Sequence, residues 1–434
     1  MRVGSIRFKG SRLCEKPSLY DGQWVLLDST ESIFSQFSPE RVPFMRIVQT
    51  VFGVFHHFDL ARELERRGHL ERVYSTFPWR RLQREGLEHR LVETFPWIHM
   101  AEYAAGRSPI DLRWFSDHLG VANALVFDRW TLGRLKRLKQ RPDALVGISG
   151  SSLSSGAWLQ REGGVFICDR GSTHQRYQQQ IVEEEYAIWG VTRPVSDERD
   201  TVREEAIYRQ ADAITVPSAY VRRTFVEMGV PDEKLYTIPY GVRLDNFRPV
   251  AEAAQGEFNV LFAGAPGLRK GVPYLLQAFA NLKHPRKTLH IAGYIQENLK
   301  AALKRLPKEN VEFLGPIPQA ELVEQMSRSH VLVLPSIEDG FGLVMAEAMA
   351  CGCPVISSTN TGGSQLYTDG VEGFIVPIRD AGAIADRMQL LADEPELQQR
   401  MRAASLLKVH SLGGWTAYGD LWEKALLQLT AGRG

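Results

Sequence analysis

The pattern of hydrophobic positions is clearest between residues 331 and 353. Residues 331–334 read Val-Leu-Val-Leu, the uninterrupted apolar run of a strand that is buried on both faces. After a polar, glycine-containing turn, residues 343–350 are good helix formers, and Gly352 suits the end of that helix. Residues 353–357 begin the next strand. The predicted order is therefore strand, loop, helix and strand.

Two series of such elements follow one another along the chain. The first begins with a strand predicted at 45–50 and the second with a strand predicted at 258–264, and residues 243–256 between them have the composition of a linker. Strands are also expected at 70–76, 144–148, 165–168, 213–217 and 289–293, and helices at 58–68, 121–141, 204–211 and 414–429. The sequence therefore predicts an α/β protein with an N-terminal domain at 45–242 and a C-terminal domain at 258–410.

Composition narrows the class of protein. Of the 434 residues, 44% are hydrophobic and 24% are charged, which is typical of a globular protein with a large core. The formal net charge of +1 gives no reason to expect nucleic-acid binding. Residues 1–44 show no strong period and are predicted to be a loosely packed extension, without the apolar run of a signal peptide. No stretch is apolar enough to predict a membrane span.

The four cysteines do not have the spacing of a disulfide framework, which is typical of proteins in a reducing cytosol. Cys14 and Cys168 are isolated in the sequence. Cys351 and Cys353 lie at a predicted helix end and a buried strand start. We therefore expect this pair to pack in the core rather than to bind a metal.

The turn after the strand at 331–334 carries the first candidate chemistry. Asp339 lies in this turn, and Glu347 follows about two helical turns later. The carboxyl ends of strands are where open α/β sheets bind ligands, and the free N–H groups of a helix start attract phosphate. The two carboxylates can accept hydrogen bonds from sugar or ribose hydroxyls. The alternative is that these acids, Glu338 among them, only stabilise the helix start.

This stretch resembles the signature of the family 4 retaining glycosyltransferases, which have the GT-B fold. The family pattern is an acidic residue, seven others and Glu, followed by Ala-Met-Ala-Cys-Gly, and residues 339–352 hold that spacing. The resemblance covers about residues 45–430. It implies two Rossmann-like parallel-sheet domains that face a cleft, with a helix in 411–430 that crosses back to complete the N-terminal domain. The family pattern adds strands at 236–241, 311–315 and 373–377.

The resemblance also assigns roles to the two acids. In the family the first acid, usually Glu, contacts the transferred hexose and the second contacts the ribose, so these roles fall to Asp339 and Glu347. Because Asp339 is one methylene shorter than Glu, either the sugar lies closer or Glu338 supplies the longer reach. The other donor-binding residues that we predict from this half are Gly340, Phe341, Gly342, Leu343, Phe313 and Gly315.

A basic loop after the run at 258–264 is predicted to lie across the cleft from the helix start. The family has an arginine after the first glycine of this loop and a lysine before the second. Lys270 matches the lysine, whereas Ala265 stands where the arginine usually is. A lysine here would stabilise the donor's diphosphate by charge. Arg269 is expected to compensate in part for the missing arginine.

In the N-terminal domain, Gly53 and His56 follow the first strand, in the loop that faces the cleft in the family. Adjacent histidines do not share one helix face, so at most one of His56 and His57 is expected to be functional. The alternative for each is a solvated or capping histidine. The G-x-G-x-x-G fingerprint of dinucleotide-binding proteins is absent from this loop.

A second group of polar residues follows the strand at 165–168. The family places a histidine near the donor hexose in this region, and His174 is the candidate. Asp169 and Arg170 are the alternatives, because they lie nearer to the end of the same strand.

Two charged stretches have both a functional and an ordinary interpretation. Residues 129–141 contain six cations and no acid, which suits contact with an anionic membrane surface or simply a solvated helix face. Residues 183–185 are three glutamates, which resemble an acidic helix start of some family members or a solvated face.

The predicted function is retaining transfer of a hexose from a nucleotide-diphosphate sugar to a glycan or lipid-linked acceptor, in the cytoplasm or peripherally at the inner membrane face. No metal and no other cofactor are expected, because GT-B enzymes use protein cations and a helix dipole instead. The alternatives are a non-catalytic nucleotide-sugar-binding partner, given Ala265 and Asp339, and a GT-B nucleotide-sugar epimerase. A dinucleotide oxidoreductase is disfavoured because its fingerprint is missing.

Overall fold

The computed structural model describes residues 43–106, 113–192 and 198–431. From Met45 onward the described residues form one compact unit. The predicted extension at 1–44, with Cys14, lies almost wholly outside the described residues, so its loose packing stays a prediction.

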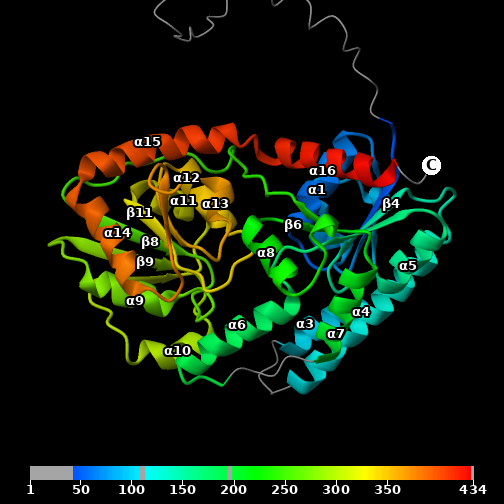
Figure 1. Ribbon diagram of the computed structural model, residues 1–434, viewed down its shortest axis with the longest axis horizontal. Coiled ribbons are helices and arrows are strands. Elements are labelled where there is room, and N and C mark those ends of the chain that lie inside the picture. The colour runs from blue at the N-terminus through cyan, green and yellow to red at the C-terminus, as the bar shows by residue number, and fades with distance from the viewer. Residues whose placement is uncertain (1–42, 107–112, 193–197, 432–434) are drawn as a thin grey trace, which may run out of the picture. The chain divides into compact units, whose positions relative to one another are not determined.

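Seven parallel strands form the first sheet, in the order β3-β2-β1-β4-β5-β6-β7 (Figure 1). The central strands are apolar and buried on both faces, as their sequence pattern predicts. The strand order reverses between β1 and β4, and ligands bind open α/β sheets at such a point. The strands are β1 (Ile47–Val51), β2 (Leu70–Ser75), β3 (Val92–Thr94), β4 (Ala144–Ile148), β5 (Val165–Asp169), β6 (Ala213–Val216) and β7 (Leu235–Thr237).

Six parallel strands form the second sheet, in the order β10-β9-β8-β11-β12-β13. Its strand order reverses between β8 and β11, so the loops after these two strands flank a second crevice. The strands are β8 (Phe258–Ala263), β9 (Lys287–Ala292), β10 (Val311–Gly315), β11 (Val331–Leu334), β12 (Val355–Ser358) and β13 (Gly373–Val376). The predicted pair of Rossmann-like parallel sheets is confirmed.

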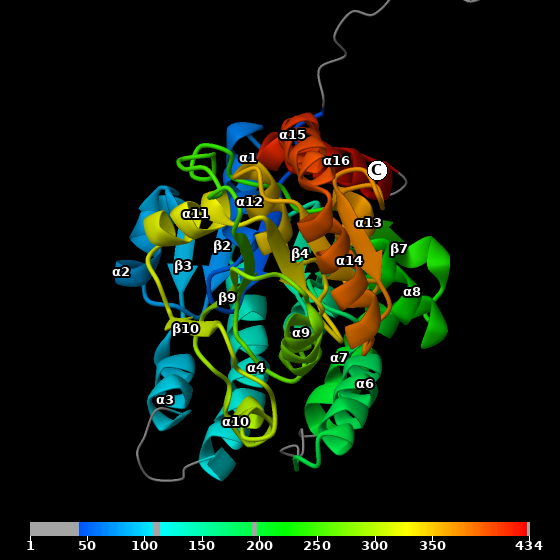
Figure 2. The same ribbon diagram turned by 90° about the vertical axis from the view of Figure 1, so that its left-hand side faces the viewer.

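Helices connect the strands of each sheet (Figure 2). Those of the first sheet are α1 (His57–Arg66), α2 (Trp79–Leu82), α3 (Trp97–Gly106), α4 (Arg113–Leu135), α5 (Leu153–Arg161), α6 (Gln175–Ile188), α7 (Glu198–Gln210) and α8 (Ala219–Glu227). Short 3₁₀ helices lie at Gln83–Glu85, His89–Leu91 and Asp232–Lys234. Those of the second half are α9 (Val272–Asn281), α10 (Glu297–Leu303), α11 (Gln319–Arg328), α12 (Leu343–Ala350), α13 (Gly363–Leu366), α14 (Ala381–Asp393) and α15 (Pro395–Ser411).

The terminal helix α16 (Gly414–Thr430) returns to the first sheet and lies against α1 (Figure 1). Trp422 and Leu426 are buried there in a cluster with Ile47 and Leu64. The aromatic and leucine spacing of this segment therefore predicted its packing face, and the crossing that the resemblance implies is confirmed.

Two predictions about charged stretches need correction. The helix expected at 121–141 ends at Leu135, so most of its cations lie beyond the helix, and Arg134 is held by Glu93 at 2.6 Å. The glutamates at 183–185 lie in the second half of α6 rather than at its start, and Glu185 is buried against Arg379 at 2.8 Å. Among the described helices, none combines the length and the apolar composition needed to cross a bilayer.

Candidate functional site

A cavity of about 990 Å³ opens at the carboxyl ends of strands from both sheets. Its walls come from the β1–α1 turn, the end of β5, residues 240–247 and the loops after β8 and β11. A smaller cavity of about 460 Å³ beside Asn259 and Arg328 contains none of the predicted site residues. The predicted residues that line the larger cavity are His56, Arg170, Lys270, Asp339, Phe341, Gly342, Leu343 and Glu347.

The start of α12 forms one wall of this cavity. Gly342 caps the helix with a φ of +79°, a left-handed conformation that side chains other than glycine disfavour. Leu343 and Val344 then open the helix and line the cavity. Because the first N–H groups of a helix have no partner within it, this wall offers hydrogen-bond donors and the positive end of the helix dipole to an anion.

Gly340 does not line the cavity but fixes the position of this loop. A Cβ atom there would lie 2.1 Å from the carbonyl oxygen of Gly171, which belongs to the N-terminal half. The hydroxyl of Ser218 donates a hydrogen bond to the carbonyl oxygen of Gly340 at 2.7 Å. The backbones of the two halves therefore approach each other closely beside the cavity, and only glycine leaves room for that approach.

Lys270 and Asp339 meet inside the cavity. The ammonium group of Lys270 donates a hydrogen bond to Oδ2 of Asp339, and both side chains are only 16% exposed. The lysine comes from the loop after β8 and the aspartate from the loop after β11, as the sequence predicted. A diphosphate at the start of α12 would compete with Asp339 for this cation, which would free the carboxylate to accept a hydrogen bond from a hydroxyl group.

Glu347 lines the same cavity from the second turn of α12. Burial raises the pKa of its carboxyl to about 7, against a smaller opposing effect of the Arg243 charge. A carboxyl with this pKa is close to half ionised at neutral pH. Burial disfavours the ionised carboxylate of Glu347, whereas hydrogen bonds from ribose hydroxyls would stabilise it.

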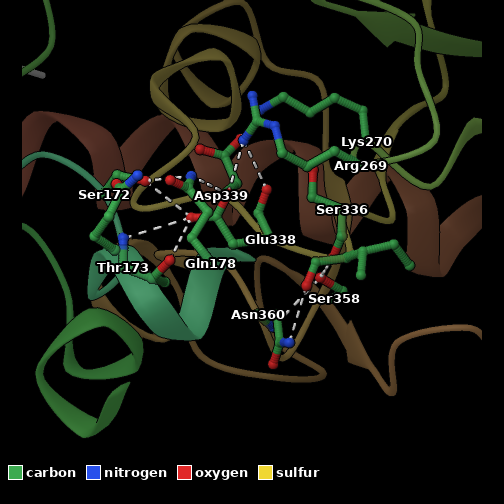
Figure 3. A network of polar contacts seen from close by, with 12 residues as sticks. Ser172, Thr173, Gln178, Arg269, Lys270, Ser336, Glu338, Asp339, Ser358 and Asn360 are labelled. Atoms are coloured by element: carbon green, nitrogen blue, oxygen red, sulfur yellow. Dashed lines mark hydrogen bonds and ion pairs between the residues drawn. The ribbon is translucent and has the colours of Figure 1, made fainter. Parts of the chain in front are cut away.

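Glu338 is fully buried between the two halves of the chain (Figure 3). Its carboxylate accepts hydrogen bonds from the hydroxyls of Ser172 and Thr173 at 3.0 and 2.9 Å, and from the Gln178 amide at 2.9 Å. Arg269 donates to the same carboxylate at 2.9 Å. Burial raises the pKa of Glu338, but Arg269 and these hydrogen bonds outweigh it and hold the pKa below its ordinary value.

This arrangement corrects two expectations. Glu338 does not have the freedom to supply the longer reach toward the sugar, because both of its oxygens are bound to other residues. Arg269 is directed to Glu338 and does not line the cavity, so it does not compensate for Ala265. The alternative, that Glu338 only stabilises the start of the helix, does not fit either, because its carboxylate binds residues of both halves.

Replacing Glu338 by alanine is expected to lower the free energy of unfolding by about 3 kcal/mol, because the buried donors of Ser172, Thr173 and Gln178 lose their acceptor. Urea denaturation measures the change. The matched control is Glu324→Ala on the exposed face of α11, where a change within about 0.5 kcal/mol is expected. A loss below about 1 kcal/mol for Glu338→Ala would show that the buried network contributes little.

His56 and His57 both turn toward Asp169, at the end of β5. The Nε2 atoms of the two rings lie 3.0 and 3.1 Å from the same carboxylate oxygen of Asp169. The two rings can approach the same carboxylate because His56 precedes the helix that His57 begins. The expectation that at most one of them is functional stays a prediction. All three groups lie within 4.8 Å of one another, close enough for one cation to bridge, so the expectation that no metal binds stays a prediction.

Arg170 and His174 are both buried, but only Arg170 reaches the cavity. Arg170 pairs with Glu204 at 3.2 Å. His174 caps α6 and packs between the rings of Tyr208 and Phe225, and burial lowers its pKa to about 4. The structure therefore does not support contact of His174 with the hexose.

Other predicted residues lie outside the cavity wall. Phe313 and Gly315 belong to the edge strand β10, and Gly53 lies next to the ring of Phe55. The cavity residues that the sequence analysis missed include Tyr240, Arg243 and Trp415. Tyr240 and Arg243 follow the last strand of the first sheet, and Trp415 lies in the first turn of α16. These segments are far apart in the sequence, so only the folded structure shows that they meet at the cavity.

Two family models match the chain. The model for Glycosyltransferase Family 4 matches residues 54–246, and the model for Glycosyl transferases group 1 matches residues 245–406. Together they extend over most of the sequence. The chain belongs to the family 4 glycosyltransferases of the GT-B fold.

Relatives of this glycosyltransferase family match part of the chain. D-inositol 3-phosphate glycosyltransferase 1 of Catenulispora acidiphila is 30% identical over 241 residues, which are 50% of this chain and 57% of that protein. An uncharacterized 41.2 kDa protein in the cps region of Klebsiella pneumoniae is 28% identical over 193 residues, 43% of this chain and 53% of that protein. The chain thus spans about half the length of the curated relatives it matches.

Solved GT-B structures share the fold. Sucrose-phosphate synthase from Thermosynechococcus elongatus aligns with a TM-score of 0.66 at 22% identity, over 89% of this chain and 100% of that one. The Anabaena protein HepE in complex with UDP-glucose aligns with a TM-score of 0.61 at 16% identity, over the same shares of the two chains. At these identities the likeness concerns the arrangement of the glycosyltransferase domains.

Proposed function

We propose that this protein transfers a hexose from a nucleoside-diphosphate sugar to a hydroxyl of a glycan or lipid-linked acceptor, with retention at the anomeric carbon. The observation that carries the proposal is the meeting of Lys270, Asp339, Glu347 and the start of α12 in one cavity. These groups offer a cation, two carboxylates and a row of N–H donors, which are complementary to a diphosphate with a sugar on each side.

Each group has a task in the transfer. Lys270 and the N–H groups at the start of α12 stabilise the charge that grows on the departing diphosphate. Asp339 and Glu347 hold the hexose and the ribose, so that the anomeric carbon is presented to the acceptor. The protein supplies the positive charge for this chemistry itself, which supports transfer without a metal. Neither acid is assigned as a nucleophile, because both lie in the donor-binding half.

Relatives guide the choice of substrates. HepE binds UDP-glucose, the Catenulispora protein is named for an inositol phosphate acceptor, and the Klebsiella protein belongs to a cps region. We infer a UDP-linked donor first and an acceptor in surface glycan synthesis. A lipid-linked acceptor would place the protein at the cytoplasmic face of a membrane, where the exposed Arg129, Lys136 and Arg137 suit anionic lipid.

A panel of nucleotide sugars is expected to raise the melting temperature of the protein only for the matching donor. A donor at 100 times its Kd stabilises the folded state by about 2.7 kcal/mol. Thermal unfolding with UDP-linked and GDP-linked sugars measures the effect, and Lys270→Ala is the matched control because it removes the proposed diphosphate contact. The absence of a shift with every nucleotide sugar would contradict the proposal.

A nucleotide-sugar-binding partner without activity is the second candidate. Ala265 lines the cavity at the position where the family has an arginine, so the diphosphate would meet one cation fewer. Donor binding without release of nucleotide in the presence of any acceptor, or of water, would favour this second function.

A further inference from the structure

We propose that Arg243 supplies a second cation to the diphosphate of the donor, in addition to Lys270. The inference rests on the proposed transfer and deepens it by adding a residue to the donor site. In the structure Arg243 pairs with Asp59 at 2.7 Å. When the donor binds, the guanidinium group of Arg243 moves from this carboxylate to the phosphate oxygens, and no covalent bond of the protein changes.

The C-terminal half offers little positive charge to a diphosphate. Each phosphate of a nucleoside-diphosphate sugar carries a negative charge. Among the described residues that line the cavity from this half, Lys270 is the only cation, and it already faces the carboxylate of Asp339. Ala265 is exposed on the same loop and adds no charge. A cation from elsewhere on the cavity wall would therefore balance the second phosphate.

Arg170 is poorly suited to provide this charge, although it lines the cavity. Its side chain is buried, and its three guanidinium nitrogens donate hydrogen bonds to the Thr173 carbonyl, Glu204 and Gln175 at 3.1, 3.2 and 2.9 Å. Movement toward a donor would leave the buried carboxylate of Glu204 without its cation, which is strongly unfavourable. Arg243, in contrast, has 48% of its side chain exposed.

The charges around Asp59 allow Arg243 to leave at little cost. Oδ1 of Asp59 accepts hydrogen bonds from both Arg62 and Arg243, so two guanidinium groups share one carboxylate. Arg62 is held in place by a further hydrogen bond to the Glu85 carbonyl. Asp59 therefore keeps a cation when Arg243 moves away, and this part of the wall carries one positive charge in excess before a ligand binds.

The backbone that carries Arg243 is fixed, whereas its side chain is long. A Cβ atom at Gly241 would lie 2.5 Å from the backbone of Gly414, so the segment packs tightly against the start of α16. Val242 is buried, and the Asn246 N–H donates a hydrogen bond to the Arg243 carbonyl at 3.1 Å. Movement of Arg243 is therefore confined to its side chain.

The position of Arg243 relative to α12 suits contact with the donor. Arg243 and Glu347 line the same cavity. Burial raises the pKa of Glu347, and the charge of Arg243 opposes this rise, so the guanidinium group acts on the second turn of α12. Leu343, at the proposed phosphate site, lies one turn earlier, about 6 Å along the helix. A rearrangement of the arginine side chain covers such a distance.

The test measures the Kd of UDP and of GDP for the full-length protein by titration calorimetry. Arg243→Ala is expected to weaken binding of the nucleotide that the parent protein binds by about 10- to 100-fold, because hydrogen bonds between charged groups contribute that much. The matched control is Arg248→Ala, which removes an exposed arginine of the same segment that does not line the cavity. Its Kd is expected to stay within about twofold of the parent value.

A second cation placed elsewhere on the wall separates charge from structure. Arg243→Ala/Ala265→Arg is expected to recover at least about tenfold of the lost affinity, since it returns a cation to the loop of Lys270. A purely structural role of Arg243 would not allow this recovery. Arg62→Ala is expected to weaken nucleotide binding by about threefold or more, because Asp59 then retains Arg243 as its cation. Melting temperatures without nucleotide show that each variant is folded.

Three outcomes would overturn the inference. The first is a Kd of Arg243→Ala that equals the parent value, the second is a loss that Ala265→Arg does not recover, and the third is unchanged affinity of Arg62→Ala. Each of them leaves the proposed function standing, because the parent protein still binds its nucleotide. A parent protein that binds neither UDP nor GDP would instead reject the proposed donor site and this inference with it.

Discussion

Replacing Lys270 by alanine is expected to lower the rate of sugar transfer by about 100-fold or more while the protein stays folded. A preorganised charge aimed at a departing group contributes on the order of 3 kcal/mol to transition-state stabilisation, which corresponds to about two orders of magnitude in rate. Lys270 is placed for this role because its ammonium group lies inside the cavity beside the start of α12. The variant also leaves Asp339 without its cation, and a bare carboxylate repels the diphosphate.

Steady-state kinetics with the donor that raises the melting temperature measures this loss. Lys300→Ala is the matched control, because Lys300 pairs with Glu297 on the surface of α10 and its removal is expected to change neither rate nor folding. The double variant Lys270→Ala/Asp339→Asn separates the two effects, since it removes the repulsion as well. Near-normal transfer by Lys270→Ala would contradict the assigned diphosphate contact.

Replacing Glu347 by glutamine is expected to stabilise the protein above pH 7 and to weaken donor binding at the same time. The pKa of Glu347 is raised from its ordinary value of 4.5 to about 7 in the folded chain. An acid with a raised pKa contributes stability that is fully present below pH 4.5 and is lost as the pH rises through 7. This ionisation costs the folded state about 3 kcal/mol by pH 8. Glutamine does not ionise, so the variant avoids that cost.

Thermal unfolding of both proteins between pH 5 and pH 8.5 measures the difference. Their melting temperatures are expected to lie close together at pH 5 and to diverge with rising pH, with the glutamine variant higher. Glu324→Gln on α11 is the control, and it is expected to follow the parent protein at every pH. Parallel curves for the parent and Glu347→Gln would show that burial does not shift this carboxyl.

The affinity for the donor is expected to change with pH in the direction opposite to the change in stability. Hydrogen bonds from ribose hydroxyls favour the ionised carboxylate, so donor affinity of the parent protein is expected to rise between pH 6 and pH 8. Glu347→Gln is expected to bind the donor about 10 to 100 times more weakly, since hydrogen bonds to a charged group contribute about 1.5–3 kcal/mol. Glu347→Ala is expected to lower turnover at least about 100-fold. Equal donor affinity of the parent and both variants would show that Glu347 does not contact the donor.

The sequence predicted which residues of the C-terminal half meet in the cavity, because most of them belong to one local stretch of the chain. Asp339, Gly342 and Glu347 belong to one strand, turn and helix, whose hydrophobic period and glycines fix the backbone over a few residues. Lys270 is distant in sequence, but it also follows a strand of the same parallel sheet. Strands of one such sheet end at one edge, so the meeting of these residues could be predicted before any contact was known.

Contacts between the two halves were beyond the reach of the sequence. Glu338 looked like an ordinary acid of a helix start, yet it binds Ser172 and Thr173, more than 160 positions earlier in the chain. Arg269 and His174 are residue types that suit the site. However, Arg269 pairs with Glu338, and His174 packs between two aromatic rings. Side-chain direction depends on which partner packs nearby, and composition does not specify that partner.

The sequence by itself determined the two parallel sheets, the order of their elements and the backbone of the loop before α12, since short-range periods and turn residues set these features. Only the tertiary structure decided that His56 and His57 share Asp169, that Tyr240 and Trp415 complete the cavity, and that Glu338 joins the halves. These arrangements arise where segments distant in sequence are packed against each other, and the free energy that selects them comes from burial and pairing in the assembled fold.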